Sequence, residues 1–384
     1  MLILLIALAA VAFRMFSAAV AFVAGVALPD AGPEGVSVFG GTRAFWDLFA
    51  RWDSGWYFQI ARYGYEYVEG GRGTMAYFPA YPLLMRWVGR LFGSSQADVY
   101  FGGIAVSWIA FVVAMVGLYR IAKLDLPDDE SLKAVVLAAV FPFAFFYGVV
   151  YTEALFLAAT IGAFYFFRTR HWILGGLCGA LATATRVNGI MMWPALAWIA
   201  FRHLSRDGGG TGASRQRVLA LTGLLLVGAG IGGYSLYVYR LSGNPLEWKD
   251  TLERWGYYPG GMPWVPLGRL VSNLIQRPIV YIATVSQAPY DTLNGLSALV
   301  FVAAIPFVWL RFGTAYGLYM TANLWLPLSS GQYEGLGRYS AVLFPFFIWL
   351  ASFRSRAVLT TAIVVSAALY TLCMALFTNL HPLY

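Results

Sequence analysis

The sequence predicts an all-α protein that crosses a membrane many times. Of its 384 residues, 60% are hydrophobic and only 11% carry a charged side chain, whereas soluble domains carry roughly 25% charged residues. Several apolar runs reach the roughly 20 residues that a helix needs to cross the hydrocarbon core. Basic residues gather in short segments between these runs, a pattern that sets membrane topology. These three observations predict one domain over residues 1–384 with about eleven spanning helices and two long loops.

The spans follow from the hydropathy of the chain. The first run, 1–26, lacks a charged start and holds Arg14 in its middle, so we expect a retained helix rather than a cleaved signal peptide. An interfacial or re-entrant segment is expected at 278–289. The other spans are expected at 100–122, 134–150, a run ending at 168, 172–185, a run ending near 201, 218–239, a run ending at 309, 314–327, 340–353 and 357–377.

Two long loops, 27–98 and 241–277, are rich in aromatic residues. In the first loop Trp46, Phe49, Trp52 and Trp56 recur at helical spacing. Tryptophan is enriched at membrane interfaces, where its ring is buried and its N–H stays near water. We therefore expect both loops to carry interfacial helices that contact membrane lipids.

The distribution of basic residues orients the chain. Arginine and lysine concentrate in the segments near 123–133, 168–170, 202–217, 311 and 354–356, which are expected on the cytoplasmic side. Both long loops then lie on the opposite, extracytoplasmic side. The chain has 26 basic residues, of which three are lysines, a usage typical of GC-rich prokaryotic genomes. We therefore expect a multi-pass protein of a prokaryotic plasma membrane.

Several classes of function have no support in the sequence. The net charge of +8 comes mostly from the topology-setting loops and does not indicate a nucleic-acid partner. Cys178 and Cys373 lie in separate apolar runs, and the three histidines show no ligand spacing with acids or cysteines. No phosphate-binding loop or dinucleotide fingerprint is present. We expect neither a metal nor a cofactor.

Four charged residues stand at the predicted outer ends of spans: Asp53, Glu153, Arg186 and Arg338. Charged side chains at the border of the hydrocarbon are costly and are often functional. Each also has a structural explanation. Asp53, Thr152 and Asn188 could cap helices, while Arg186 and Arg338 could reach toward lipid headgroups.

Taken together, the four residues suit the transfer of a sugar from a lipid-linked phosphate. Arginine forks bind a leaving phosphate in bidentate geometry and stabilise its developing charge. A carboxylate can remove the proton of an attacking hydroxyl. An outward-facing site favours a polyprenyl-phosphate sugar over a nucleotide sugar. The aromatic loops would cover the site, with Tyr77, Phe78 and Pro79 in its wall.

Four motifs in order carry a resemblance to a known family. They read RWDSGWYFQIARYGY at 51–65, YFPAYPLL at 77–84, YTEALF at 151–156 and ATATRVNGI at 182–190, and LGRY at 336–339 with a proline at 345 extends the match. These motifs resemble the PIG-V family, GPI mannosyltransferase 2 and its prokaryotic relatives, within the GT-C superfamily of membrane glycosyltransferases.

The resemblance implies a GT-C-like helical bundle and inverting transfer of mannose from a polyprenyl-phosphate donor to a lipid or glycan hydroxyl. It places the general base at Asp53 and a phosphate-binding arginine at Arg186. We expect Arg338 to share the donor phosphate. Supporting roles are expected for Glu153, Asn188, Tyr77, Phe78 and Trp52.

Two rival hypotheses remain: a transporter or flippase of a lipid-linked sugar, and a non-catalytic membrane scaffold. Carriers place their polar groups near the middle of the bilayer on broken helices, whereas the four charged residues stand at helix ends. Arg14 and Pro142 lie inside predicted spans and keep the transporter alternative open.

Overall fold

The computed structural model describes residues 1–29, 31, 45–206, 212–257, 260–279 and 288–383. Within these ranges the regular structure is helical and contains no strand, which confirms the all-α prediction. The α-helices are α1 (Leu2–Ala27), α2 (Ser54–Tyr63), α3 (Ala80–Gly89), α4 (Gln96–Ala122), α5 (Asp128–Val140), α6 (Glu153–Arg168), α7 (Trp172–Thr185), α8 (Trp193–Arg206), α9 (Ala213–Val227), α10 (Ala229–Ser242), α11 (Glu247–Arg254), α12 (Trp264–Gln276), α14 (Ala288–Phe312), α15 (Thr314–Leu328), α16 (Leu336–Ala341), α17 (Phe344–Ala351) and α18 (Arg356–Thr378). Four short 3₁₀ helices join them: η1 (Phe45–Phe49), η2 (Thr74–Ala76), η3 (Pro142–Tyr147) and η4 (Val187–Met192).

Four helices of the described chain are long and apolar enough to cross a membrane. These are α1, α4, residues Tyr290–Phe312 of α14, and α18, and a fifth span arises if α9 and α10 count as one helix bent by 42°. The protein is therefore a multi-pass membrane protein, but the predicted eleven spans are not confirmed. Most of the segment predicted at 278–289 lies outside the described residues.

The other predicted spans are too short or are interrupted. The run at 134–150 is divided between α5 and η3, because Pro142 has no N–H to continue the helix. The predicted tenth span, 340–353, is divided between the short helices α16 and α17. Helices α6, α7, α8 and α15 have 14 to 16 residues. Each is shorter than the roughly 20 residues that span a bilayer.

Small residues let neighbouring helices approach closely within the bundle. A Cβ atom on Gly176 of α7 would lie 2.5 Å from the carbonyl oxygen of Gly223 in α9. A Cβ atom on Gly102 of α4 would lie 2.4 Å from the backbone nitrogen of Gly89 in α3. Such contacts are typical of helix packing in membranes, where small side chains allow backbones to touch.

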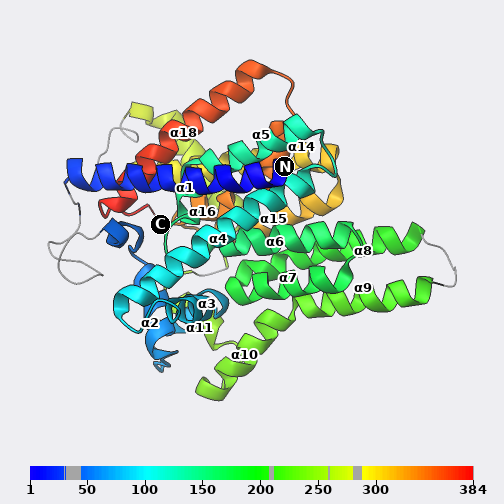
Figure 1. Ribbon diagram of the computed structural model, residues 1–384, viewed down its shortest axis with the longest axis horizontal. Coiled ribbons are helices and arrows are strands. Elements are labelled where there is room, and N and C mark those ends of the chain that lie inside the picture. The colour runs from blue at the N-terminus through cyan, green and yellow to red at the C-terminus, as the bar shows by residue number, and fades with distance from the viewer. Residues whose placement is uncertain (30, 32–44, 207–211, 258–259, 280–287, 384) are drawn as a thin grey trace.

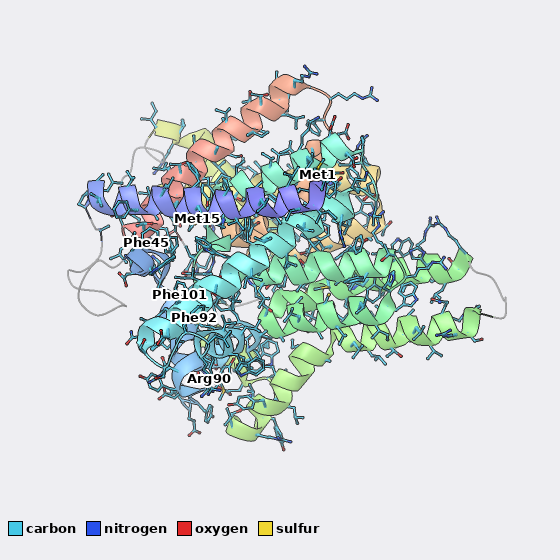
Figure 2. All side chains as sticks on the ribbon, in the orientation of Figure 1. Met1, Met15, Phe45, Arg90, Phe92 and Phe101 are labelled. Atoms are coloured by element: carbon cyan, nitrogen blue, oxygen red, sulfur yellow. The ribbon has the colours of Figure 1, made fainter. Side chains whose placement is uncertain are left out.

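The helices of the two long loops gather at one end of the molecule. Figure 1 shows α2, α3 and α11 together at the lower left, while α8 and α9 extend to the opposite side. Much of the surface elsewhere is apolar: Met15 on the outer side of α1, marked in Figure 2, is 58% exposed. This arrangement brings the loop helices close to the N-terminal end of α6.

Arg14 is buried inside the bundle and takes no part in that region. Its guanidinium lies 4.0 Å from the centroid of the Phe111 ring and donates a hydrogen bond of 3.2 Å to Tyr370 Oη. The side chain is therefore held by aromatic neighbours from α4 and α18. It does not line the cavity described below.

Candidate active site

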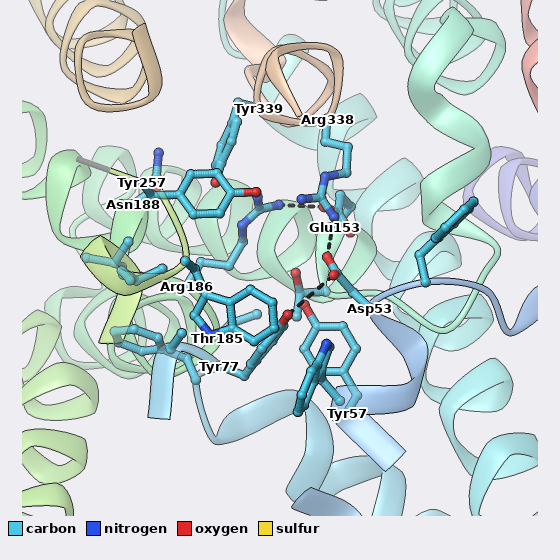
Figure 3. Close-up of a pocket in the computed structure, with 18 of the residues that line it drawn as sticks. Asp53, Tyr57, Tyr77, Glu153, Thr185, Arg186, Asn188, Tyr257, Arg338 and Tyr339 are labelled. Atoms are coloured by element: carbon cyan, nitrogen blue, oxygen red, sulfur yellow. Dashed lines mark hydrogen bonds and ion pairs between the residues drawn. The ribbon is translucent and has the colours of Figure 1, made fainter. Parts of the chain in front are cut away.

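A cavity of 370 Å³ lies where the loop helices meet α6 and α7. Its wall combines segments that are far apart in the sequence: the loop around α2, the start of α6, the segment after α7, the end of α11 and the residues before and within α16. Figure 3 shows the charged residues of the wall facing one another. The lining residues are Trp52, Asp53, Trp56, Tyr57, Ala76, Tyr77, Phe78, Thr152, Glu153, Thr185, Arg186, Val187, Asn188, Leu252, Trp255, Tyr257, Glu334, Arg338 and Tyr339.

Asp53 precedes α2 but does not cap it. The residue occupies the N-cap position, yet its side chain accepts no hydrogen bond from the helix. Instead, Oδ2 lies 2.9 Å from Arg338 Nη1 and Oδ1 accepts a hydrogen bond of 3.3 Å from Tyr77 Oη (Figure 3). The capping explanation of Asp53 is therefore wrong, because the carboxylate is turned into the cavity.

The backbone just before Asp53 adopts an unusual conformation. Trp52 has a φ angle of 53°, which is uncommon for a residue with a bulky side chain. The Asp53 N–H donates to Tyr151 Oη at 3.2 Å, and Trp52 itself lines the cavity. The bond from the Asp53 N–H to Tyr151 thus helps to hold this turn in place.

Glu153 links the two arginines. It is the first residue of α6, and its side chain is 1% exposed. Glu153 Oε1 lies 2.7 Å from Arg186 Nη1 and 3.8 Å from Arg338 Nε. Because both distances are measured from the same oxygen atom, these two arginine nitrogens lie close together. The side chains of Arg186 and Arg338 are 10% and 7% exposed, so neither reaches freely toward lipid headgroups.

The carboxylates keep both arginines charged. Burial alone would lower the pKa of the Arg338 guanidinium, but the negative charges of Asp53 and Glu153 outweigh burial and hold this pKa well above its usual value. Burial opposes the charge of Arg186 as well, and Glu153 raises its pKa. Burial, followed by the charge of Asp53, raises the pKa of Tyr77. At neutral pH the cavity therefore presents two cations and a neutral phenol that donates to Asp53.

Asn188 and Thr152 do not have the capping roles considered for them. Asn188 lies in η4 and donates from Nδ2 to the carbonyl oxygen of Asn323 at 3.3 Å. Thr152 occupies the N-cap position of α6 without a side-chain hydrogen bond to the helix. Both residues line the cavity.

The aromatic wall joins the two long loops. The rings of Trp56 and Tyr77 stack with centroids 5.9 Å apart, and Trp255 of the second loop meets Trp56 edge-on at 5.1 Å. Phe78 also lines the cavity, and its ring packs 5.6 Å from Trp248. The prediction of Pro79 in the wall is wrong: Pro79 occupies the N-cap position of α3 and does not line the cavity.

Several lining residues were not predicted from the sequence. Tyr57 of α2 follows Asp53, the N-cap position of that helix, by four residues. This spacing places both on one side of the helix and could have identified Tyr57. Tyr257 and Glu334 meet across the cavity rim, where Tyr257 Oη donates to Glu334 Oε1 at 3.1 Å. Burial raises the pKa of Glu334, while the bond from Tyr257 opposes that rise. No sequence pattern indicated this contact between segments 77 residues apart.

The described residues do not assemble a metal site. No group of three or more histidine, cysteine, aspartate or glutamate side chains is close enough to hold an ion within the part of the chain that the structure describes. The cavity itself contains two arginines beside its carboxylates, a donor set suited to an anionic ligand.

Comparison with known proteins identifies a family over more than half of the chain. Residues 1–227 match the family described as Mannosyltransferase (PIG-V). Two curated relatives are the GPI mannosyltransferase 2 proteins of Cryptococcus neoformans var. neoformans serotype D, strains JEC21 and B-3501A. Each is 30% identical over 148 residues, covering 36% of this chain and 34% of the relative. The match thus spans about a third of the length of these relatives.

Solved structures of the Archaeoglobus fulgidus oligosaccharyltransferase align with nearly the whole chain. The apo form has a TM-score of 0.49 at 13% identity and covers 97% of this chain and 56% of that chain. The complex with Zn and sulfate has a TM-score of 0.48 at 14% identity, with 97% and 53% covered. The complex with an inhibitory peptide and a dolichol-phosphate has a TM-score of 0.47 at 12% identity, with 98% and 56% covered.

Proposed function

This chain belongs to the mannosyltransferase (PIG-V) family, and from that premise we propose that it is a membrane glycosyltransferase. It moves mannose from a polyprenyl-phosphate donor to a hydroxyl group of a lipid or glycan acceptor. The site is the cavity lined by Asp53, Arg186 and Arg338, and it faces the extracytoplasmic side of a prokaryotic plasma membrane.

One observation supports this proposal most strongly. A carboxylate and two arginines, carried by segments as much as 285 residues apart, meet in a single cavity. Burying charged groups costs several kcal/mol per ion, because each ion loses its hydration. One ion pair would be enough for a purely structural role, so the second arginine needs another explanation. The extra arginine and the lining of aromatic rings suit a substrate with a phosphate, a sugar and an apolar chain.

The donor phosphate occupies the side of the cavity formed by Arg186 and Arg338. Glu153 holds the Arg186 guanidinium and lies near that of Arg338, which Asp53 also holds, so both need little reorganisation when the phosphate arrives. Charge-assisted bonds from arginine forks are stronger than neutral ones and become stronger still as negative charge develops on the leaving phosphate. This side of the cavity therefore favours the transition state over the bound donor.

Asp53 acts as the general base for the acceptor. The acceptor oxygen forms a bond to C1 of the mannose, the bond between C1 and the phosphate oxygen breaks, and polyprenyl phosphate leaves with that electron pair. The hydroxyl proton passes to Asp53 Oδ1, which Tyr77 contacts from the other side. Attack on the face opposite to the phosphate inverts the configuration at C1.

The rival transporter function lacks comparable support from the geometry. Glu153 is the first residue of α6 and Arg186 is the residue directly after α7, so this ion pair joins two helix ends. A carrier would place such groups on broken helices near the middle of the bilayer. Arg14, the charge inside α1, is held by aromatic rings away from the cavity.

A transfer assay tests the proposed function. Purified protein in liposomes is mixed with radiolabelled polyprenyl-phosphate-mannose and a lipid extract that supplies acceptors, and a parallel sample receives labelled GDP-mannose. We expect label in a new glycolipid or glycan from the polyprenyl donor and none from the nucleotide sugar. Movement of the intact donor across the liposome membrane, without a new product, would instead establish a transporter.

A further inference from the structure

A second cavity of 410 Å³ lies at the other end of α6, between α6, α8 and the junction of α14 with α15. Helix α6 has 16 residues, so Glu153 and Arg168 at its two ends are separated by about 22 Å. Figure 1 shows the end of α8 on the opposite side of the molecule from α2 and α11. This cavity is therefore separate from the proposed active site.

Among the described residues, the second cavity is lined by more positive than negative charge. Arg168, Arg202 and Arg206 all line it, and none of its described lining residues is acidic. Arg168 is neutralised by Asp125, whose Oδ1 lies 2.8 Å from Arg168 Nη2. Arg202 and Arg206 are exposed, and no other residue in the described ranges forms an ion pair with either. Because they are four positions apart in α8, they lie on the same helix face.

The N-terminus of α15 adds to this positive field. Gly313, Thr314 and Ala315 line the cavity, and the N-cap position is occupied by Gly313, which has no side chain that could cap the helix. The first N–H groups of a helix have no partner inside it, and the helix dipole places partial positive charge there. The two arginines of α8 and the start of α15 thus present donors to the same space.

Aromatic rings line the rest of the cavity. Trp198, Phe312 and Tyr316 contribute to its wall, and the ring of Trp198 lies 5.8 Å from that of Phe201, which is 59% exposed. Tryptophan next to exposed phenylalanine is typical of the interface between headgroups and hydrocarbon. The membrane topology by itself explains why arginines lie in this region. It does not explain why they line a cavity that the N-terminus of α15 also lines.

We propose that this cavity binds the phosphate headgroup of an anionic phospholipid. Arg202 and Arg206 hold the phosphate together with the N–H groups at the start of α15, and the acyl chains extend along the apolar surface near Phe201. Basic pockets between transmembrane helices recognise anionic headgroups in this way. Free phosphate shares the headgroup chemistry, but the aromatic wall and the exposed Phe201 favour the lipid.

Native mass spectrometry of the full chain, released from neutral detergent, tests the proposal. The protein is titrated with phosphatidylglycerol and, separately, with phosphatidylcholine, and inorganic phosphate is added as a competitor. The variant is R202Q/R206Q. Its matched control is R354Q/R356Q, which removes the same charge from two exposed arginines outside the cavity.

We expect phosphatidylglycerol to bind at least about tenfold more tightly than phosphatidylcholine. R202Q/R206Q should lose at least about tenfold of that affinity, because arginines near an anionic headgroup attract it. The control should stay within about threefold of the unaltered protein. Equal binding of the two lipids to the unaltered protein would overturn the proposal even if the variant failed to fold. Equal losses in variant and control, or displacement of the lipid by millimolar phosphate, would also overturn it.

Discussion

At the scale of single residues, the proposed mechanism requires Arg338 to contact both Asp53 and the donor phosphate. Its Nη1 pairs with Asp53, and its Nε lies within 3.8 Å of Glu153. An incoming phosphate adds a third negative group to the same guanidinium. Because Arg186 is also held by Glu153, the phosphate can be shared between two arginines, which leaves Asp53 Oδ1 to accept from a hydroxyl.

Glu153 should therefore matter for donor binding through the two arginines that it contacts. Glu153→Gln removes the charge that holds Arg186 and Arg338, and breaking a buried ion pair is strongly destabilising. We expect donor affinity to fall by at least about tenfold, equivalent to about 1.4 kcal/mol, and the thermal midpoint to fall. Isothermal titration with polyprenyl phosphate measures the first quantity.

Glu130→Gln provides the control for this substitution. Glu130 lies in the first turn of α5, away from the cavity. Its substitution should leave donor affinity within about twofold. If both variants bound polyprenyl phosphate as the unaltered protein does, Glu153 would have no role in fixing the arginines.

At the scale of elements, the short helix α16 carries Arg338 and positions it in the wall of the cavity. Its preceding residue Gly335 adopts a φ angle of 73°, a conformation that favours glycine. Gly337 lies against the buried ring of Phe143, because a Cβ atom added there would lie 2.3 Å from ring atoms. The position of Arg338 thus depends on close packing between α16 and η3.

Gly337→Ala should disturb this packing and displace Arg338. Overpacking of a buried contact costs about 1–3 kcal/mol, so we expect a lower thermal midpoint and a loss of transfer activity greater than the loss of folded protein. Gly268→Ala in α12 is the matched control, because no atom lies within 4 Å of the added Cβ. Transfer assays on both variants check this, and equal activity would show that α16 tolerates the shift.

The sequence predicted elements well where apolar runs are continuous. The predicted run 172–185 coincides with α7, and the run 357–377 differs from α18 by one residue at each end. Prediction was poorer where the backbone breaks inside an apolar run, as at Pro142 and between α9 and α10. Hydropathy indicates that a segment lies in an apolar environment, but it does not indicate whether the segment forms one continuous helix.

At the scale of the whole molecule, the two long loops form one cover over the cavity. Arg254 Nη1 in the second loop donates a hydrogen bond of 3.2 Å to the carbonyl oxygen of Gly71 in the first loop. Arg72 Nε in the first loop donates a hydrogen bond of 2.9 Å to the carbonyl oxygen of Arg254. Tyr257 extends this cover to Glu334. The motifs predicted residues that the structure brings together in one cavity. Contacts such as that of Tyr257 with Glu334 depend on tertiary structure and left no pattern in the sequence.

Donor binding should tighten this cover. If the second loop closes over the donor, backbone amides in 241–257 should exchange more slowly with deuterium when polyprenyl phosphate is present, because closure reduces local opening. Hydrogen exchange followed by mass spectrometry measures the change, with α18 as an internal reference. Unchanged exchange in the second loop would support a loop that only anchors the protein at the interface.

The central claim is that Asp53 removes the proton of the acceptor, and Asp53→Asn tests it most directly. The measurement is the rate of mannose transfer from labelled polyprenyl-phosphate-mannose by purified protein, with Asp129→Asn in the exposed first turn of α5 as control. Loss of a general base costs about 10²–10⁴ in rate, so we expect a loss in that range while polyprenyl phosphate still binds and the control stays near full activity. Transfer within about tenfold of the unaltered protein would contradict the account.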